Sequence, residues 1–126
     1  MKLYGTLIFL VVLIVAFGIF TSNFLTETTK DITSNFDNVY TAINNENWKL
    51  AQQQIAHSEK LWNKHKKWWT VFIDHQEIDN IDMSFVRIGE YIKYHNKALS
   101  SGELVVLKQS FEHIPEKEVV NLKNIL

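Results

Sequence analysis

The sequence predicts an all-α protein, in which one N-terminal transmembrane helix is followed by an antiparallel bundle of four or five amphipathic helices. An uncharged apolar run fills the first fifth of the chain, and apolar residues beyond it recur at spacings of three and four. Outside that run, glycine and proline are limited to Gly89, Gly102 and Pro115. A fold rich in strands or loops would need more of them.

The apolar segment at residues 3–25 is predicted to be a transmembrane signal-anchor helix. After Lys2 no charge appears until Glu27. About 20 apolar residues at 1.5 Å per residue cross the hydrocarbon core, where every backbone group must be paired within a helix. A cleaved signal peptide is the alternative, but the bulky residues at the end of the run do not suit a peptidase site. A buried core helix of a soluble protein is a third interpretation.

The charges that flank this segment predict its orientation. Lys2 and the terminal amine precede it, whereas Glu27, Lys30 and Asp31 follow it. The positive end stays in the cytoplasm. We therefore expect a single-pass protein of the cell membrane, with a cytoplasmic N-terminus and an extracytoplasmic helical bundle domain over residues 26–126.

Apolar stripes and caps divide this domain into helices. A stripe over residues 32–43, which includes Tyr40, fits a helix that continues the anchor or follows it, and Asn47 then suits the N-cap of a long helix that ends near Ile73. The stripe of the long helix is Trp48, Ala51, Ile55, Trp62, Trp69 and Phe72, with Leu61 and Trp68 beside it. The ranges 40–55 and 91–106 look faintly alike as two helix–turn–helix units, although such likeness arises by chance between any two hairpins.

Three later helix starts are predicted from local motifs. Asp74-x-x-Glu77 is a capping-box variant before a third helix, although an unbroken helix through this point also fits. Ser100-x-x-Glu103 is a cleaner capping box for a fourth helix. Pro115 suits the first turn of a last short helix, with Val119 and Leu122 facing inward.

Composition excludes several functional classes. The chain has no cysteine, which excludes disulfides, thiolate zinc sites and thiol nucleophiles. The domain carries 12 basic and 14 acidic residues, so its charge of −2 opposes non-specific nucleic-acid binding. Neither a glycine-rich phosphate loop nor a G-x-S-x-G motif is present. We expect no cofactor, no nucleic-acid partner and no enzymatic activity.

The tryptophans form the first candidate surface. Four of them fall within 22 residues, and they either fill the core or form a partner groove or a membrane-facing belt. The second interpretation makes Trp62, Trp68 and Trp69 partner-binding candidates. Residues 64–69 also mix basic and aromatic side chains, as membrane-surface patches do, but the acidic neighbours favour a solvated face.

The second candidate is a polar cluster of His75, Asp79 and Asp82, whose spacings of four and three put them on one helix face. Imidazole and carboxylates can bind zinc or manganese, but the spacing matches no strong zinc signature. An electrostatic interpretation pairs the acidic residues after the turn with Lys64, Lys66 and Lys67 before it. In a third interpretation the cluster binds a protein partner.

Three stretches together resemble a bacterial family of unknown function, made of short single-pass membrane proteins that are common in anaerobic spore formers. They are residues 42–51 with Asn47-Trp48, residues 62–82 with Trp62-x5-Trp68 and the run from Ile73 to Asp82, and the tail from Leu107 through Ile114 to Leu122-x-Asn124-Ile125. The resemblance implies a membrane anchor with a helical domain, and it implies no activity.

These observations predict a membrane-tethered, non-enzymatic helical interaction module, such as an accessory subunit of a membrane protein complex. Its partners would be the lipid bilayer, through residues 3–25, and another protein in the membrane. The alternative is a metal- or pH-sensing domain that uses His75, Asp79 and Asp82.

Overall fold

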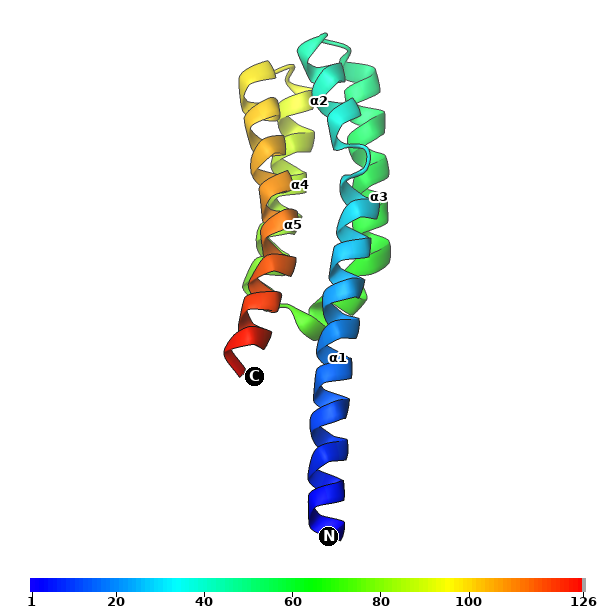
Figure 1. Ribbon diagram of the computed structural model, residues 1–126. Helices are drawn as coiled ribbons and strands as arrows, with labels where there is room; N and C mark the ends of the chain where they lie inside the picture. The colour runs from blue at the N-terminus through cyan, green and yellow to red at the C-terminus, as the bar shows by residue number, and fades with distance from the viewer. Residues whose placement is uncertain (126) are drawn as a thin grey trace.

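The computed structural model describes residues 1–125 of the chain, and side chains up to Ile114. Its regular elements are all α-helices, namely α1 (Lys2–Thr33), α2 (Phe36–Asn44), α3 (Trp48–Phe72), α4 (His75–Lys93) and α5 (Lys97–Ile125). The predicted all-α class with a long apolar first helix is confirmed. Helices α3, α4 and α5 run antiparallel in turn, and α2 continues upward from α1 beside α3 (Figure 1).

Helix α1 has two halves in opposite surroundings. Between residues 3 and 20 its large apolar side chains are exposed, and α1 is the described helix that is long and apolar enough to cross a membrane. From Thr21 onward one face of α1 is buried against α3 and α5. Leu25 is fully buried in that face, so the core begins earlier in the chain than the predicted boundary between residues 25 and 26.

A break at Ser34 and Asn35 separates α1 from α2. The Asn35 side-chain amide donates a hydrogen bond to the Gln54 carbonyl of α3, at 3.0 Å, and so ties the break to the neighbouring helix. The residues of the stripe predicted over residues 32–43 are buried, except for Tyr40, whose side chain is exposed.

Phe111 of α5 lies at the centre of the core. Its ring packs edge-on against Trp62 and Trp69 of α3, at 5.4 and 5.7 Å between centroids, and also contacts Phe36 and Phe85. All five side chains are buried. Edge-to-face aromatic pairs add stabilisation beyond the area they bury. Trp62 and Trp69 of the α3 stripe therefore lie in the core, as one interpretation of the tryptophans predicted.

The α2–α3 and α4–α5 turns have the same structure. Each has a residue with a φ of 56°, Glu46 or His95, followed by an asparagine that caps the next helix. The Asn47 and Asn96 side-chain oxygens accept hydrogen bonds from the N–H groups three residues later, at 3.3 and 3.0 Å. Each turn also has the two backbone bonds of a Schellman motif, one of which is donated by the N–H of the asparagine itself. The turns repeat at an offset of 49 residues, whereas the stretches compared in the sequence are 51 apart.

Two predicted helix starts are wrong. Helix α5 begins at Lys97, so Ser100 and Glu103 lie inside it. Asn96 takes the capping role, and the Ser100 hydroxyl instead donates back to the Asn96 carbonyl at 2.6 Å. Helix α5 also continues through Pro115, because one proline removes a single backbone N–H without having to end a helix. The inward orientation predicted for Val119 and Leu122 lies outside the described side chains.

Candidate functional site

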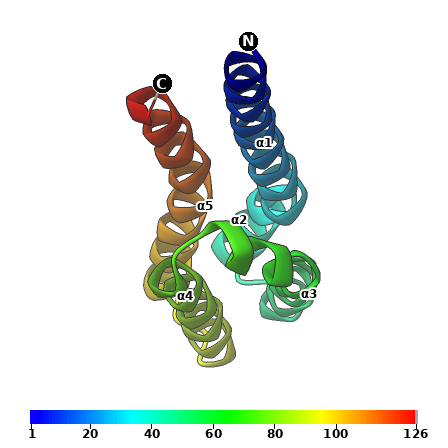
Figure 2. The same ribbon diagram turned by 90° about the horizontal axis from the view of Figure 1, so that it is seen from below.

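Helix α3 ends at a sharp connection that faces the viewer in Figure 2. Ile73 adopts an extended backbone, is buried, and donates its N–H to the Trp69 carbonyl at 2.8 Å. Asp74 is the N-cap residue of α4, which confirms the predicted break. Its side chain makes no capping hydrogen bond, so the first predicted capping box is not formed as expected.

Asp82 joins α4 to α3 with both carboxylate oxygens. One accepts a hydrogen bond from the indole N–H of Trp62 at 2.8 Å, and the other lies 2.6 Å from the Lys66 ammonium. Both charged side chains are about one-third exposed. This pair is the contact between the basic end of α3 and the acidic start of α4 that the electrostatic interpretation describes. Lys64 and Lys67 are exposed.

The three residues of the polar cluster have different surroundings. His75 and Asp79 are exposed, whereas the Asp82 carboxylate is turned toward Lys66 and Trp62. Within the described side chains, no group of three histidine, aspartate or glutamate residues is arranged to hold a metal ion. The shared helix face predicted from the spacing is therefore not assembled into a ligand set.

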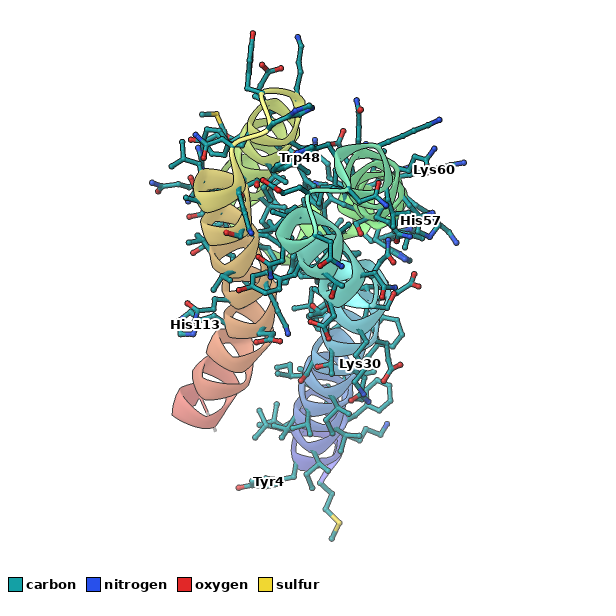
Figure 3. The ribbon with its side chains drawn as sticks, turned by 90° about the horizontal axis from the view of Figure 1, so that it is seen from above. Tyr4, Lys30, Trp48, His57, Lys60 and His113 are labelled. Carbon is teal, nitrogen blue, oxygen red and sulfur yellow. The ribbon has the colours of Figure 1, made fainter. Side chains whose placement is uncertain are left out.

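The four tryptophans also separate. Trp62 and Trp69 are buried, and the Trp69 indole donates to the Thr28 hydroxyl of α1 at 2.9 Å. Trp48 stacks on His95 with centroids 5.0 Å apart, between the two asparagine-capped turns (Figure 3). Trp68 is 57% exposed. Of the tryptophans predicted to bind a partner, Trp68 alone is presented at the surface in this structure.

Trp68, Val71 and Phe72 form an exposed apolar end of α3, which we call the α3 tip. Val71 is 65% exposed, and Phe72 is half-buried. The Phe72 ring packs between two rings of α1, at 5.8 Å from Phe17 and 5.9 Å from Phe24. The tip therefore lies beside the place where the exposed half of α1 meets its buried half.

A polar contact between α1 and α3 was not found from the sequence, because its partners are 34 residues apart. His65 Nε2 lies 2.9 Å from an Asp31 carboxylate oxygen. Ser34 lines the same hollow, so the residue types match a hydrolase triad. The Ser34 hydroxyl, however, donates to the Asp31 carbonyl at 2.8 Å and not to His65. The nucleophile–base hydrogen bond of such a triad is absent from this hollow.

A second missed contact joins α4 to α5. One Glu103 carboxylate oxygen accepts hydrogen bonds from Ser84 at 2.9 Å and from two nitrogens of Arg87 at 2.9 and 2.7 Å. The hydrogen bond to Glu103 raises the pKa of Arg87 above its usual value, against the lowering effect of burial, and the Glu103 charge adds to the rise. The Arg87 guanidinium is charged in both the folded and the unfolded chain at ordinary pH, so it does not make the stability of the fold depend on pH in that range.

Comparisons with known proteins identify one family. No curated protein and no solved structure matches the chain significantly. A model of a domain of unknown function, DUF4363, matches residues 19–125. That range begins where the side chains of α1 become buried, so it coincides with the bundle. The match confirms the predicted likeness to a family of unknown function, and the chain therefore belongs to the DUF4363 family.

Proposed function

We propose that the chain is a membrane-tethered, non-enzymatic interaction module, and that α1 anchors its bundle in a lipid bilayer. The observation that carries this proposal is the exposed apolar half of α1. Residues 3–20 form an uncharged helix about 27 Å long at 1.5 Å per residue, close to the thickness of a hydrocarbon core. Water would solvate such a surface poorly, whereas lipid removes that cost.

The continuity of α1 supports an anchor over a cleaved signal peptide. The helix is unbroken from Lys2 to Thr33, and its second half is part of the core. Cleavage near residue 20 would therefore cut inside a helix, next to bulky side chains. The flanking charges support a cytoplasmic N-terminus and an extracytoplasmic bundle. A single-pass protein of an anaerobic spore former would fit the same proposal.

An accessory role beside another membrane protein is the second step of the proposal. The exposed residues of the predicted partner set are Trp68, His75 and Asp79, which lie within the last two turns of α3 or the first two turns of α4. Trp62 and Trp69 are unsuited to contact because they are buried. A partner would meet Trp68 as its aromatic contact and His75 and Asp79 as hydrogen-bonding groups. The metal-sensing alternative has no comparable support.

A carbonate wash of membranes tests the anchor. We expect the full-length chain to stay in the pellet. Replacing Leu10 and Leu13 by Asp should release it, because each charge at a helix centre disfavours insertion by about 2.5–3.5 kcal/mol. The matched control is Val105→Asp, at an exposed position of the bundle, which should leave the chain in the pellet. Recovery of a shortened soluble wild type would contradict the proposal.

Crosslinking in intact membranes tests the partner. We expect the wild type to capture a membrane protein, and the His75→Ala/Asp79→Asn variant to lose it while its helical circular dichroism stays unchanged. A control with Lys49→Ala and Leu50→Ala, two exposed residues at the other end of α3, should keep the partner. Equal capture by all three chains would exclude the α3–α4 connection as the contact surface.

A further inference from the structure

We propose that the α3 tip inserts into the membrane interface beside α1, so that the bundle rests directly on the phospholipid surface. The inference depends on the proposed anchoring by α1 and adds a second site of lipid contact. It assigns a role to Val71, an exposed apolar side chain that the core does not use, and adds lipid to the proposed contacts of the exposed Trp68.

The height of the tip above the bilayer follows from α1. No linker separates the anchor from the bundle, because α1 continues from one to the other without a break. Phe72 touches Phe17 and Phe24, which lie about 5 and 6 Å on either side of Phe20 at 1.5 Å per residue. Phe20 ends the apolar run of the anchor. Phe72 is therefore level with the end of the membrane-spanning stretch, to within about one helical turn.

The side chains on α3 are ordered as an interface requires. Val71 and Phe72 are nearest to the hydrocarbon level, and Trp68 lies one turn farther away, at the depth where amphipathic indoles collect. Lys64 and Lys67 follow, both exposed, with stems long enough to lie along the interface while the ammonium groups reach lipid phosphates. The sequence of apolar, aromatic and basic residues thus matches increasing distance from the membrane.

The charge near the tip argues against a simple electrostatic attraction to anionic lipid. Asp74 is exposed at the connection, and Asp82 already pairs with Lys66. Burial of the apolar side chains must therefore carry the contact. Insertion should be about as deep in zwitterionic as in anionic bilayers, which distinguishes it from the binding of a polybasic segment.

The other end of α3 supplies an internal control. Trp48 lies about 30 Å from Trp68 along the helix at 1.5 Å per residue. It packs on His95 between the two asparagine-capped turns (Figure 3). The exposed residues around it include Asn45, Glu46 and Asn96, which suit water. A rigid bundle with its α3 tip in the interface must hold Trp48 away from the lipid.

Spin labels can measure this arrangement because the native chain has no cysteine. We would label Leu13→Cys, Val71→Cys and Val105→Cys separately in the full chain, in phosphatidylcholine vesicles. All three positions are exposed in the bundle structure, so the labels should not disturb the core. The ratio of collision rates with oxygen and with a nickel chelate reports the depth of each label. We expect a high ratio at Leu13, an intermediate one at Val71 and a low one at Val105.

The outcomes separate this inference from the proposed function. A low ratio at all three positions would show that α1 is not in the bilayer, and both proposals would fail. A high ratio at Leu13 with a low one at Val71 would leave the anchor intact and overturn the interfacial contact. A Val71 label shielded from both reagents would show that a second copy covers the tip, which would also overturn it.

Tryptophan fluorescence gives an independent measurement. With brominated phosphatidylcholine we expect the wild type to be quenched, and Trp68→Phe to lose more of that quenching than Trp48→Phe. Including an anionic phospholipid in the same vesicles should leave the quenching nearly unchanged. Equal losses in the two variants would contradict insertion of the α3 tip.

Discussion

The two halves of α1 have the same backbone structure and opposite surroundings. In the first half apolar residues surround the helix on all sides, and nearly all are exposed. In the second half the buried positions are Thr21, Leu25, Thr28, Thr29 and Ile32, at spacings of three and four. A helix that is apolar all round suits lipid, whereas an apolar stripe suits a protein core. The change of pattern within one helix marks where the exposed apolar half ends and the half buried in the protein core begins.

Two threonines show how the surroundings change the role of one side chain. Thr6 and Thr28 each donate their hydroxyl to the carbonyl four residues earlier, at 2.8 Å in both cases. The Thr6 hydroxyl makes that local hydrogen bond, whereas the Thr28 oxygen also accepts a hydrogen bond from the buried Trp69 indole. The hydrogen bond to the carbonyl four residues earlier satisfies the hydroxyl donor in either half of α1. The hydrogen bond from Trp69 additionally joins α1 to α3.

The largest expected difference between the halves comes from one pair of isoleucines. Ile32 is fully buried, and Ile14 is 56% exposed. We expect Ile32→Ala to lower the free energy of unfolding by about 2–5 kcal/mol, because it leaves a cavity in the core. Ile14→Ala should change it by less than about 0.5 kcal/mol. Urea unfolding of the full chain in mild detergent, followed by tryptophan fluorescence, measures both. Equal effects would contradict the division of α1 into two halves.

A smaller difference is expected for the threonines. In Thr28→Val the Trp69 indole N–H stays buried without its acceptor, which should cost about 1–3 kcal/mol of unfolding free energy. Thr6→Val removes a hydroxyl with similar local bonding from the exposed half and should cost less than about 0.5 kcal/mol. The same urea titration applies. If Thr28→Val were as mild as Thr6→Val, the tertiary hydrogen bond would not contribute to the fold.

Local patterns predicted much of this fold. The stripe of α3, the Asn47 cap and the break at Asp74 depend on residues close together in the chain. Trp68 and Trp69 show the strength of the helical period, because a step of about 100° separates an exposed indole from a buried one. The sequence pattern had placed Trp62 and Trp69 on the apolar stripe of this helix and Trp68 beside the stripe.

The failures also have physical causes. Ser100-x-x-Glu103 fits a capping box, but Asn96 competes for the same helix start, and Arg87 takes the Glu103 carboxylate. The contacts that define the α3–α4 end lie beyond any local pattern. Trp62 and Asp82 are 20 residues apart, and Thr28 and Trp69 are 41 apart. Which of several acidic residues meets Lys66 depends on how the helices pack, and the sequence pattern does not contain that information.

The smallest expected effects concern ion pairs, which again compare a contact within α1 with a contact between helices. Glu27 and Lys30 lie on α1, 3.6 Å apart and about 70% exposed. Lys66 and Asp82 join α3 to α4 at 2.6 Å and are about one-third exposed. We expect Glu27→Gln to have no measurable effect on thermal unfolding, because water and salt screen such a pair.

Asp82→Asn should retain an oxygen that can accept from the Trp62 indole while it removes the charge opposite Lys66. We therefore expect a loss of less than about 1 kcal/mol, measured as a small drop in Tm that shrinks as salt is added.

Zinc and manganese should leave the Tm of the wild type unchanged, since His75 and Asp79 do not join Asp82 in a ligand set. A metal-dependent rise in Tm that Asp82→Asn abolished would mean that the three side chains gather around an ion. In that case an Asp82 carboxylate oxygen that now contacts Trp62 or Lys66 would have to bind the ion instead.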